Sequence, residues 1–204
     1  HAARNLGYED IITVINVGLD KPNFMGGLLL ITKMVAERGN GRILGAQCVG
    51  PGNVSKQIAQ WAMAIQAGST VEDIINADLP YAPPFSLAID HFITTAHIMQ
   101  NKMKGRLKGM SAADVKKKLD TSEDSFYLDV RGPDEFEEMR LGIGETLIPL
   151  GALRRRLGEL PQDKDREIIC YCKAALRGYE AALILEANGW RNVKVMEGGL
   201  MAWP

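Results

Sequence analysis

The chain has 204 residues, of which 46% are hydrophobic and 24% are charged, and its formal net charge is −1 at pH 7. This composition is typical of a globular protein and excludes a disordered or collagen-like chain. The near-zero charge indicates no nucleic-acid partner, and the lack of an apolar run of about 20 residues indicates no membrane span. Three cysteines cannot build a disulfide scaffold, and so few cysteines fit a reducing compartment. We therefore expect a cytoplasmic protein.

The charged residues are distributed unevenly along the chain. Residues 1–105 hold eight basic and eight acidic residues, whereas residues 106–204 hold sixteen and seventeen. This change predicts two domains, 1–105 and 106–204, and indicates that the first buries part of its surface against a partner subunit or against sequence outside the chain. Because the chain begins with His1 rather than Met, we expect a fragment of a longer protein.

The first half has a pattern of strands followed by helices. Three strands are expected, and a Gly- and Asn-rich turn makes the last two a hairpin: Ile11–Val17, Gly26–Glu37 and Arg42–Val49. Three helices are expected after them, from a cap at Asn53 to about Ala67, from Thr70, and over Ser86–Met103. The segment Leu79–Phe85 holds three prolines and is predicted to be irregular. The fold class predicted for this half is α+β, an antiparallel sheet with helices.

The second half alternates short strands with helices. A basic connection at Gly105–Gly109 is the expected domain boundary, and Ser111 is the expected cap of a helix over Ala112–Leu119. Further strands are expected at Ser125–Val130, Thr146–Pro149, Glu167–Tyr171 and Asn192–Met196. The helices between them are expected at Pro133–Met139, Ala152–Leu160 and Arg177–Asn188, with a terminal turn from Gly198. This alternation predicts an α/β domain with a parallel sheet.

One cysteine lies where an apolar strand ends and a helix begins. Cys172 follows the strand, and Lys173 and Arg177 flank the loop. Backbone N–H groups, the positive end of the helix and both cations favour thiolate over thiol. A small buried thiol is the alternative, which the turn and the two cations make less favoured. Cys170 lies within the apolar strand and is expected to belong to the core.

Three blocks in the second half resemble the rhodanese family of sulfurtransferases. They are Leu128–Phe136 (LDVRGPDEF), Ile148–Leu157 (IPLGALRRRL) and Glu197–Trp203 (EGGLMAW), in the family's order over residues 106–204. The resemblance implies that Cys172 carries a persulfide sulfur and that Arg177 assists it. It also implies an active-site loop completed by Lys173, Ala174, Ala175 and Leu176.

The length of this loop bears on its chemistry. Cys172 to Arg177 spans six residues, the sulfurtransferase length, whereas the related dual-specificity phosphatases have one residue more, so a phosphatase is the minor alternative. Many sulfurtransferases have glycine at the position of Ala175, and the block at 141–146 also departs from the family pattern. The expected substrates are small sulfane-sulfur donors and thiol acceptors. Asp129 and Arg131 are expected to form a structural ion pair rather than to act as catalysts.

The first half resembles the C-terminal dimerisation domain of flavin-dependent pyridine nucleotide–disulfide reductases, in the branch of coenzyme A disulfide reductase and NADH oxidase. The resemblance rests on Leu79–Asp90 (LPYAPPFSLAID), Arg42–Gly50 and Ala64–Asp73. It implies a homodimer in which Tyr81 contacts substrate across the subunit boundary. A packed loop tyrosine is an equally open alternative. Cys48, His91 and His97 are expected to be structural, and no metal site is expected.

A phosphate-binding turn of the G-x-G-x-x-G type follows no strand in this sequence. The chain therefore looks like the C-terminal part of a coenzyme A disulfide reductase fused to a rhodanese domain. The resemblance implies FAD, NAD(P)H and coenzyme A for the full-length parent, but no cofactor bound by these residues alone. A catalytically silent binding and dimerisation module is the alternative function.

Overall fold

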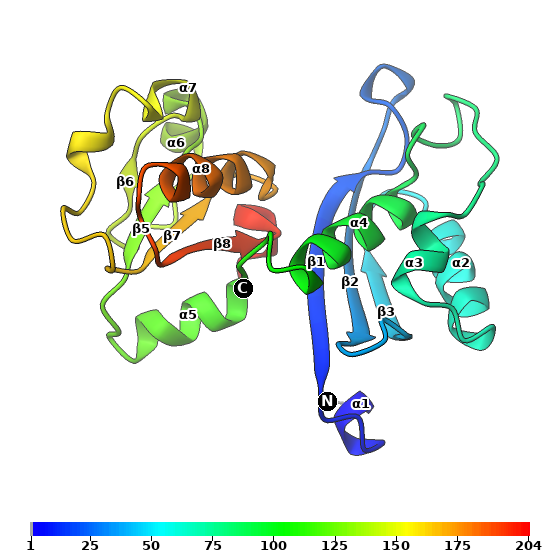
Figure 1. Cartoon of the computed structure of the whole chain (residues 1–204). Coiled ribbons are helices and arrows are strands. Elements are labelled where there is room, and N and C mark those ends of the chain that lie inside the picture. The colour runs from blue at the N-terminus through cyan, green and yellow to red at the C-terminus, as the bar shows by residue number, and fades with distance from the viewer. Residues whose placement is uncertain (1) are drawn as a thin grey trace. The chain divides into compact units, whose positions relative to one another are not determined.

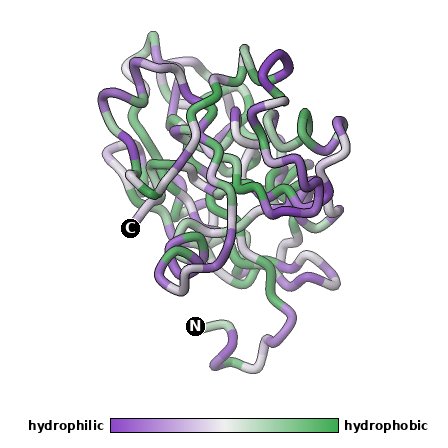
Figure 2. Tube along the Cα trace, turned by 90° about the vertical axis from the view of Figure 1, so that its left-hand side faces the viewer, coloured by the Kyte–Doolittle hydropathy of each residue, from purple (hydrophilic) through white to green (hydrophobic). Residues whose placement is uncertain are grey.

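The computed structural model describes residues 2–204 and divides into two compact units, the first ending at Arg106 and the second running from Leu107 to Pro204 (Figure 1). Hydrophobic stretches alternate with hydrophilic ones along the trace of the chain (Figure 2). Each unit encloses its own hydrophobic core, so each is described by itself.

The first unit contains a three-stranded antiparallel sheet in the order β1-β2-β3. After the short helix α1 (Ala2–Asn5), the strands are β1 (Ile11–Leu19), β2 (Leu29–Glu37) and β3 (Ile43–Val49), with the 3-10 turn η1 (Asn23–Met25) between the first two. The pairing of β1 with β2 runs without interruption from Ile11 opposite Glu37 to Leu19 opposite Leu29. The structure thus confirms the antiparallel sheet, and β1 is two residues longer than the sequence predicts.

Three helices follow this sheet and supply the other side of the core: α2 (Val54–Gln66), α3 (Val71–Ile75) and α4 (His91–Met103). The side chain of Asn53 caps α2, as expected, by accepting a hydrogen bond from the Lys56 backbone N–H. The core holds the rings of Trp61 from α2 and Phe92 from α4, whose centroids lie 4.3 Å apart. The helices therefore cover one face of the sheet (Figure 1).

The expected start of the last helix of this unit was wrong. The helix begins at His91 rather than Ser86, and Asp90 caps it by accepting a hydrogen bond of 3.0 Å from the Phe92 N–H. The same carboxylate also accepts hydrogen bonds from Lys56 and Gln57 of α2. Asp90 is therefore fixed to a neighbouring helix, whereas Ser86 extends the irregular stretch beyond the proline-rich segment Leu79–Phe85 that the sequence predicts.

The second unit contains a five-stranded parallel sheet in the order β4-β8-β7-β5-β6. Its strands are β4 (Gly109–Ser111), β5 (Phe126–Asp129), β6 (Thr146–Leu147), β7 (Ile168–Tyr171) and β8 (Val193–Glu197). Its helices are α5 (Ala112–Asp120), α6 (Pro133–Glu138), α7 (Leu150–Leu153) and α8 (Leu176–Ala187), with 3-10 turns η2 (Leu157–Glu159) and η3 (Gly199–Ala202). Helix α5 covers one face of the sheet, and α6, α7 and α8 lie on the other (Figure 1). The α/β fold class is confirmed.

The division between the units falls within the expected connection Gly105–Gly109, between Arg106 and Leu107. The sequence did not predict β4, in which Gly109–Ser111 pairs with β8 at the edge of the sheet. One helix prediction in this unit was wrong. The helix expected over Ala152–Leu160 is instead α7 followed by η2. Gly158 within that span and Pro161 directly after it lower its helix propensity, which favours two short turns.

Candidate active site at the carboxyl edge of the parallel sheet

Cys172 directly follows β7, the central strand of the parallel sheet, and precedes helix α8. Only 2% of the residue is exposed. Cys170, two residues earlier, is fully enclosed within the strand, and burial raises the pKa of its thiol above the ordinary value. Both cysteines are free thiols. Cys170 is therefore a core residue, as the sequence predicts, whereas Cys172 stands at the edge where parallel α/β sheets bind ligands.

The backbone after Cys172 is anchored by the C-terminal segment. The Leu200 N–H donates a hydrogen bond of 2.9 Å to the carbonyl oxygen of Cys172, and the Met201 N–H donates one of 3.1 Å to that of Lys173. In a trans peptide the N–H points opposite to the carbonyl, so the N–H groups of Lys173 and Ala174 point away from η3. No backbone acceptor receives either group within residues 2–204. These groups are free to bind a sulfur anion beside the N-terminus of α8.

Gly199 makes this anchoring possible. Its φ is +55°, and a Cβ atom at this position would lie 2.2 Å from the carbonyl oxygen of Cys172. It would also lie 2.8 Å from the carbonyl carbon of Lys173. The double glycine of the C-terminal motif therefore has a geometric role, because any side chain at Gly199 would push η3 away from the cysteine loop.

Ala175, the N-cap of α8, adopts φ +87° and ψ −26°. It is one of two non-glycine residues with positive φ in the described chain, the other being Ser122. This left-handed conformation costs an alanine about 1–2 kcal/mol more than a glycine. Ala175, which stands where many sulfurtransferases have glycine, therefore introduces backbone strain into the loop.

Arg177 in the first turn of α8 is held by a carboxylate from α6. Its Nη1 and Nη2 atoms donate to Glu135 at 2.6 and 2.8 Å. Hydrogen bonds from Arg177 hold the pKa of Glu135 down to about 2, against the opposing effect of partial burial. The pKa of Arg177 is raised above its ordinary value, first by Glu135, while the charge of Cys172 and a hydrogen bond to it act in the same direction. Arg177 is therefore fixed by Glu135 in the first turn of the helix that follows the cysteine loop.

The sequence reasoning gave no role to Glu135. The residue lies 42 positions before Arg177, and no local pattern predicts their pairing. The sequence does indicate one contact of Glu135. It is the third residue of a helix that begins at Pro133, a position from which a glutamate can cap the start of the helix. The Gly132 N–H does donate to its Oε2 atom at 3.2 Å.

The expected ion pair between Asp129 and Arg131 is present and buried, with Arg131 Nη2 lying 2.6 Å from Asp129 Oδ2. The guanidinium also donates to the carbonyl oxygens of Glu135 at 3.0 Å and Met139 at 2.7 Å. Arg131 therefore fastens the end of α6 to the sheet edge, and α6 in turn carries the carboxylate that holds Arg177.

The remaining loop side chains differ in exposure. Lys173 and Leu176 are exposed, Leu176 to 69%, whereas Ala174 and Ala175 are half-buried. Lys173 is therefore the freely solvated cation of the loop, and Leu176 presents an apolar side chain beside Arg177.

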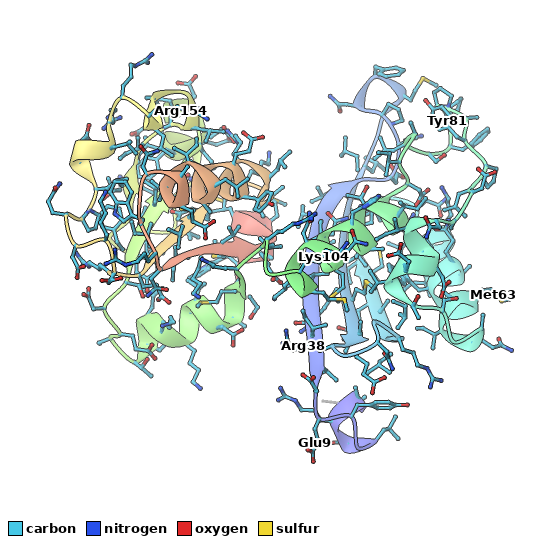
Figure 3. All side chains as sticks on the ribbon, viewed as in Figure 1. Glu9, Arg38, Met63, Tyr81, Lys104 and Arg154 are labelled. Carbon is cyan, nitrogen blue, oxygen red and sulfur yellow. The ribbon has the colours of Figure 1, made fainter. Side chains whose placement is uncertain are left out.

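In the first unit, Tyr81 lies in the irregular segment between α3 and α4 and is 52% exposed (Figure 3). Its exposure leaves it able to contact a ligand or a partner. Cys48 is buried and accepts a hydrogen bond from Thr32 Oγ1, and burial raises the pKa of its thiol. No group of ligating side chains in residues 2–204 could hold a metal ion. No helix among these residues is long and apolar enough to span a bilayer.

His91 is more than the ordinary helical residue that the sequence predicts. Its ring is buried between α4 and the sheet and lies 2.9 Å from Thr32 Oγ1. The Asn16 side chain lies 3.4 Å from the same ring. Burial lowers the pKa of His91 to about 4, so the imidazole is neutral near pH 7.

A parallel sheet with a cysteine loop between its central strand and the following helix is the architecture of a rhodanese-like domain. An antiparallel sheet covered on one face by helices fits a dimerisation domain of disulfide reductases. Comparison with protein families agrees. Residues 2–93 match the pyridine nucleotide-disulphide oxidoreductase dimerisation domain, and residues 111–204 match the rhodanese-like domain. The chain belongs to the rhodanese-like family through its second unit and joins that domain to a reductase dimerisation domain.

Individual relatives match either one unit or both. YtwF of Bacillus subtilis is 32% identical over 102 residues, which cover 48% of this chain and 90% of YtwF. A sulfurtransferase of Allochromatium vinosum is 29% identical over 94 residues, covering 46% of this chain and 85% of the relative.

Two solved structures match both units. An NAD-dependent persulfide reductase from A. fulgidus is 37% identical with a TM-score of 0.87, covering 99% of this chain and 35% of that one. Reduced CoADR-RHD from Bacillus anthracis is 29% identical with a TM-score of 0.85, covering 97% of this chain and 34% of that one. The present chain thus spans about a third of the length of these two structures. The resemblance to a coenzyme A disulfide reductase–rhodanese fusion is confirmed.

Proposed function

We propose that the second unit transfers sulfane sulfur through a persulfide on Cys172. The observation that carries this proposal is the loop geometry, in which Cys172 is followed by the unpaired N–H groups of Lys173 and Ala174 and by Arg177 in the first turn of α8. Such donors stabilise negative charge on sulfur. The resemblance of this unit to sulfurtransferases supports the same chemistry.

The reaction takes two displacement steps. The Cys172 thiolate attacks the outer sulfur of a donor, a new S–S bond forms, and the bond to the donor's remaining group breaks as that group leaves with its electron pair. Loop N–H groups and Arg177 stabilise the departing anion. An acceptor thiolate then attacks the outer sulfur of the Cys172 persulfide and restores the Cys172 thiolate. The two steps need no external oxidant or reductant.

We further propose that this chain acts as part of a larger reductase that uses FAD and NAD(P)H on coenzyme A disulfides, persulfides or polysulfides. The likeness to a persulfide reductase and to CoADR-RHD supports this. No residue here is assigned to a flavin or a nicotinamide, because these residues contain no Gly-rich turn after a strand. The first unit would form a homodimer, with Tyr81 contacting substrate across it, and three free cysteines favour the cytoplasm.

Sulfur transfer is tested by cyanolysis. The purified chain is incubated with thiosulfate or a polysulfide, the excess donor is removed by desalting, cyanide is added, and thiocyanate is measured. The wild type and the Cys170→Ser control should both form thiocyanate, whereas Cys172→Ser should form none. Equal activity in the wild type and in Cys172→Ser would refute the proposal.

A silent binding and dimerisation module is the second candidate, favoured by the 2% exposure of Cys172. It predicts that no donor loads sulfur onto the chain. It also predicts a dimer by light scattering that the Cys172→Ser substitution leaves unchanged. A chain that stays monomeric over a wide concentration range would contradict it.

A further inference from the structure

Glu135 offsets the charge of Arg177, whose guanidinium belongs to the first turn of the helix that follows the cysteine loop. The carboxylate binds Arg177 through two short hydrogen bonds, and about a third of each side chain remains exposed. The pKa of Glu135 is about 2, so the carboxylate is ionised throughout the neutral range. Arg177 therefore presents an ion pair to an incoming ligand rather than a free cation.

Three features of α6 show that this pair is fixed in place. Glu135 also accepts a hydrogen bond from the Gly132 N–H at the start of the helix. Arg131 holds the other end of α6 through the carbonyl oxygens of Glu135 and Met139. The buried Asp129 carboxylate in turn binds Arg131. Since both ends of the helix are tied down, the backbone that carries Glu135 is held where its carboxylate meets Arg177.

The rest of the loop supplies little charge. Lys173 is its other cation and is solvated, while Ala174, Ala175 and Leu176 carry no charge or hydroxyl group. Counted together with Glu135, the loop from Lys173 to Arg177 therefore has one net positive charge. A dianion gains less from such a site than it would from two free cations.

We propose that Glu135 determines the charge selectivity of the site for sulfur donors. By neutralising Arg177, it disfavours dianionic donors relative to donors that carry a single negative charge. Glu135 acts through Arg177 and touches no reacting atom in this account, so it is a residue that sets specificity rather than a catalytic residue. The inference rests on the proposed sulfur transfer.

The test compares two donors of the same chemistry that differ in charge. Thiosulfate is a dianion and the methanethiosulfonate anion carries one charge, and both release a sulfane sulfur to a thiolate. The quantity measured is the ratio of kcat/KM for thiosulfate to that for methanethiosulfonate, with cyanide as acceptor. Glu135→Gln should raise this ratio about fivefold. The substitution leaves the charge of Arg177 unneutralised, and the second negative charge of thiosulfate then gains from it in a partly exposed site. The increase should shrink as ionic strength rises.

Two further variants separate charge from structure. Glu135→Asp keeps the carboxylate and should leave the ratio near that of the wild type. Glu159→Gln removes the acidic partner of Arg156, another ion pair of the same unit, and should also leave the ratio unchanged. If Glu135→Gln gives too little folded protein, Glu135→Ala removes the same charge and should shift the ratio in the same direction.

An unchanged or lowered ratio in Glu135→Gln and Glu135→Ala, with active wild type, would overturn this inference alone. A wild type that accepts sulfur from neither donor would overturn the proposed function, and the inference with it.

Discussion

Substitution of Gly199 by alanine should disrupt both the stability of the second unit and the cysteine loop. The added Cβ would lie 2.2 Å from the Cys172 carbonyl oxygen, a backbone atom that cannot move without moving the loop. The left-handed φ of +55° adds about 1 kcal/mol for an alanine. Displacement of η3 would break the hydrogen bonds to Cys172 and Lys173, each contributing about 1 kcal/mol.

The expected loss is thus about 3 kcal/mol, or roughly 10–20 °C in the Tm of a unit of this size. Hydrogen-exchange mass spectrometry resolves the two units, because peptides from β7 and β8 should lose protection while those from β1 and β2 should not. Gly151→Ala is the matched control, since nothing lies within 4 Å of its added Cβ. Disruption of the cysteine loop should also change the rate at which iodoacetamide alkylates Cys172. A loss of unfolding free energy below about 1 kcal/mol, or an unchanged alkylation rate, would contradict this prediction.

Three further predictions follow from the same structure. Ala175→Gly should stabilise the second unit by about 1 kcal/mol in urea unfolding, because glycine removes the strain at φ +87°; destabilisation would contradict it. Arg131→Lys should cost about 2–4 kcal/mol in the same assay, since lysine cannot replace the fork that binds Asp129 and two carbonyls, and a cost within 0.5 kcal/mol would argue against it. In the folded chain the pKa of His91 is lowered to about 4, whereas in the unfolded chain it returns to about 6.5. Below pH 6.5 the unfolded chain therefore binds more protons at this residue than the folded chain does. Stability of the first unit should therefore be complete above pH 6.5 and fall by about 2–3 kcal/mol as pH drops to 4.5, a slope absent in His91→Gln.

The parts of the site that local sequence determines were predictable. Cys172 lies at a strand end before a helix, and both flanking elements are read from apolar patterns within a few residues. Caps at Asn53 and Ser111 are also local, because the capping side chain and its backbone donor are three residues apart. The hairpin turn and the strand–helix alternation specified the two fold classes for the same reason.

The features that were missed depend on contacts between distant segments. Glu135 meets Arg177 across 42 residues, and His91 meets Thr32 across 59. The start of α4 was misplaced because Ser86 and Asp90 are both good capping residues, and only the contacts of Asp90 with α2 decide between them. Tertiary contacts of this kind leave no periodic signal in the chain.

The position of a donated sulfur on the chain is the most direct test of sulfur transfer through Cys172. The full chain, treated with a polysulfide and blocked with an alkylating reagent, can be digested and its three cysteines located by tandem mass spectrometry. Sulfur transfer through Cys172 predicts one additional sulfur atom on that residue, and none on Cys48 and Cys170, whose thiols have raised pKa values. An added sulfur on either of those residues, or none on Cys172, would contradict it.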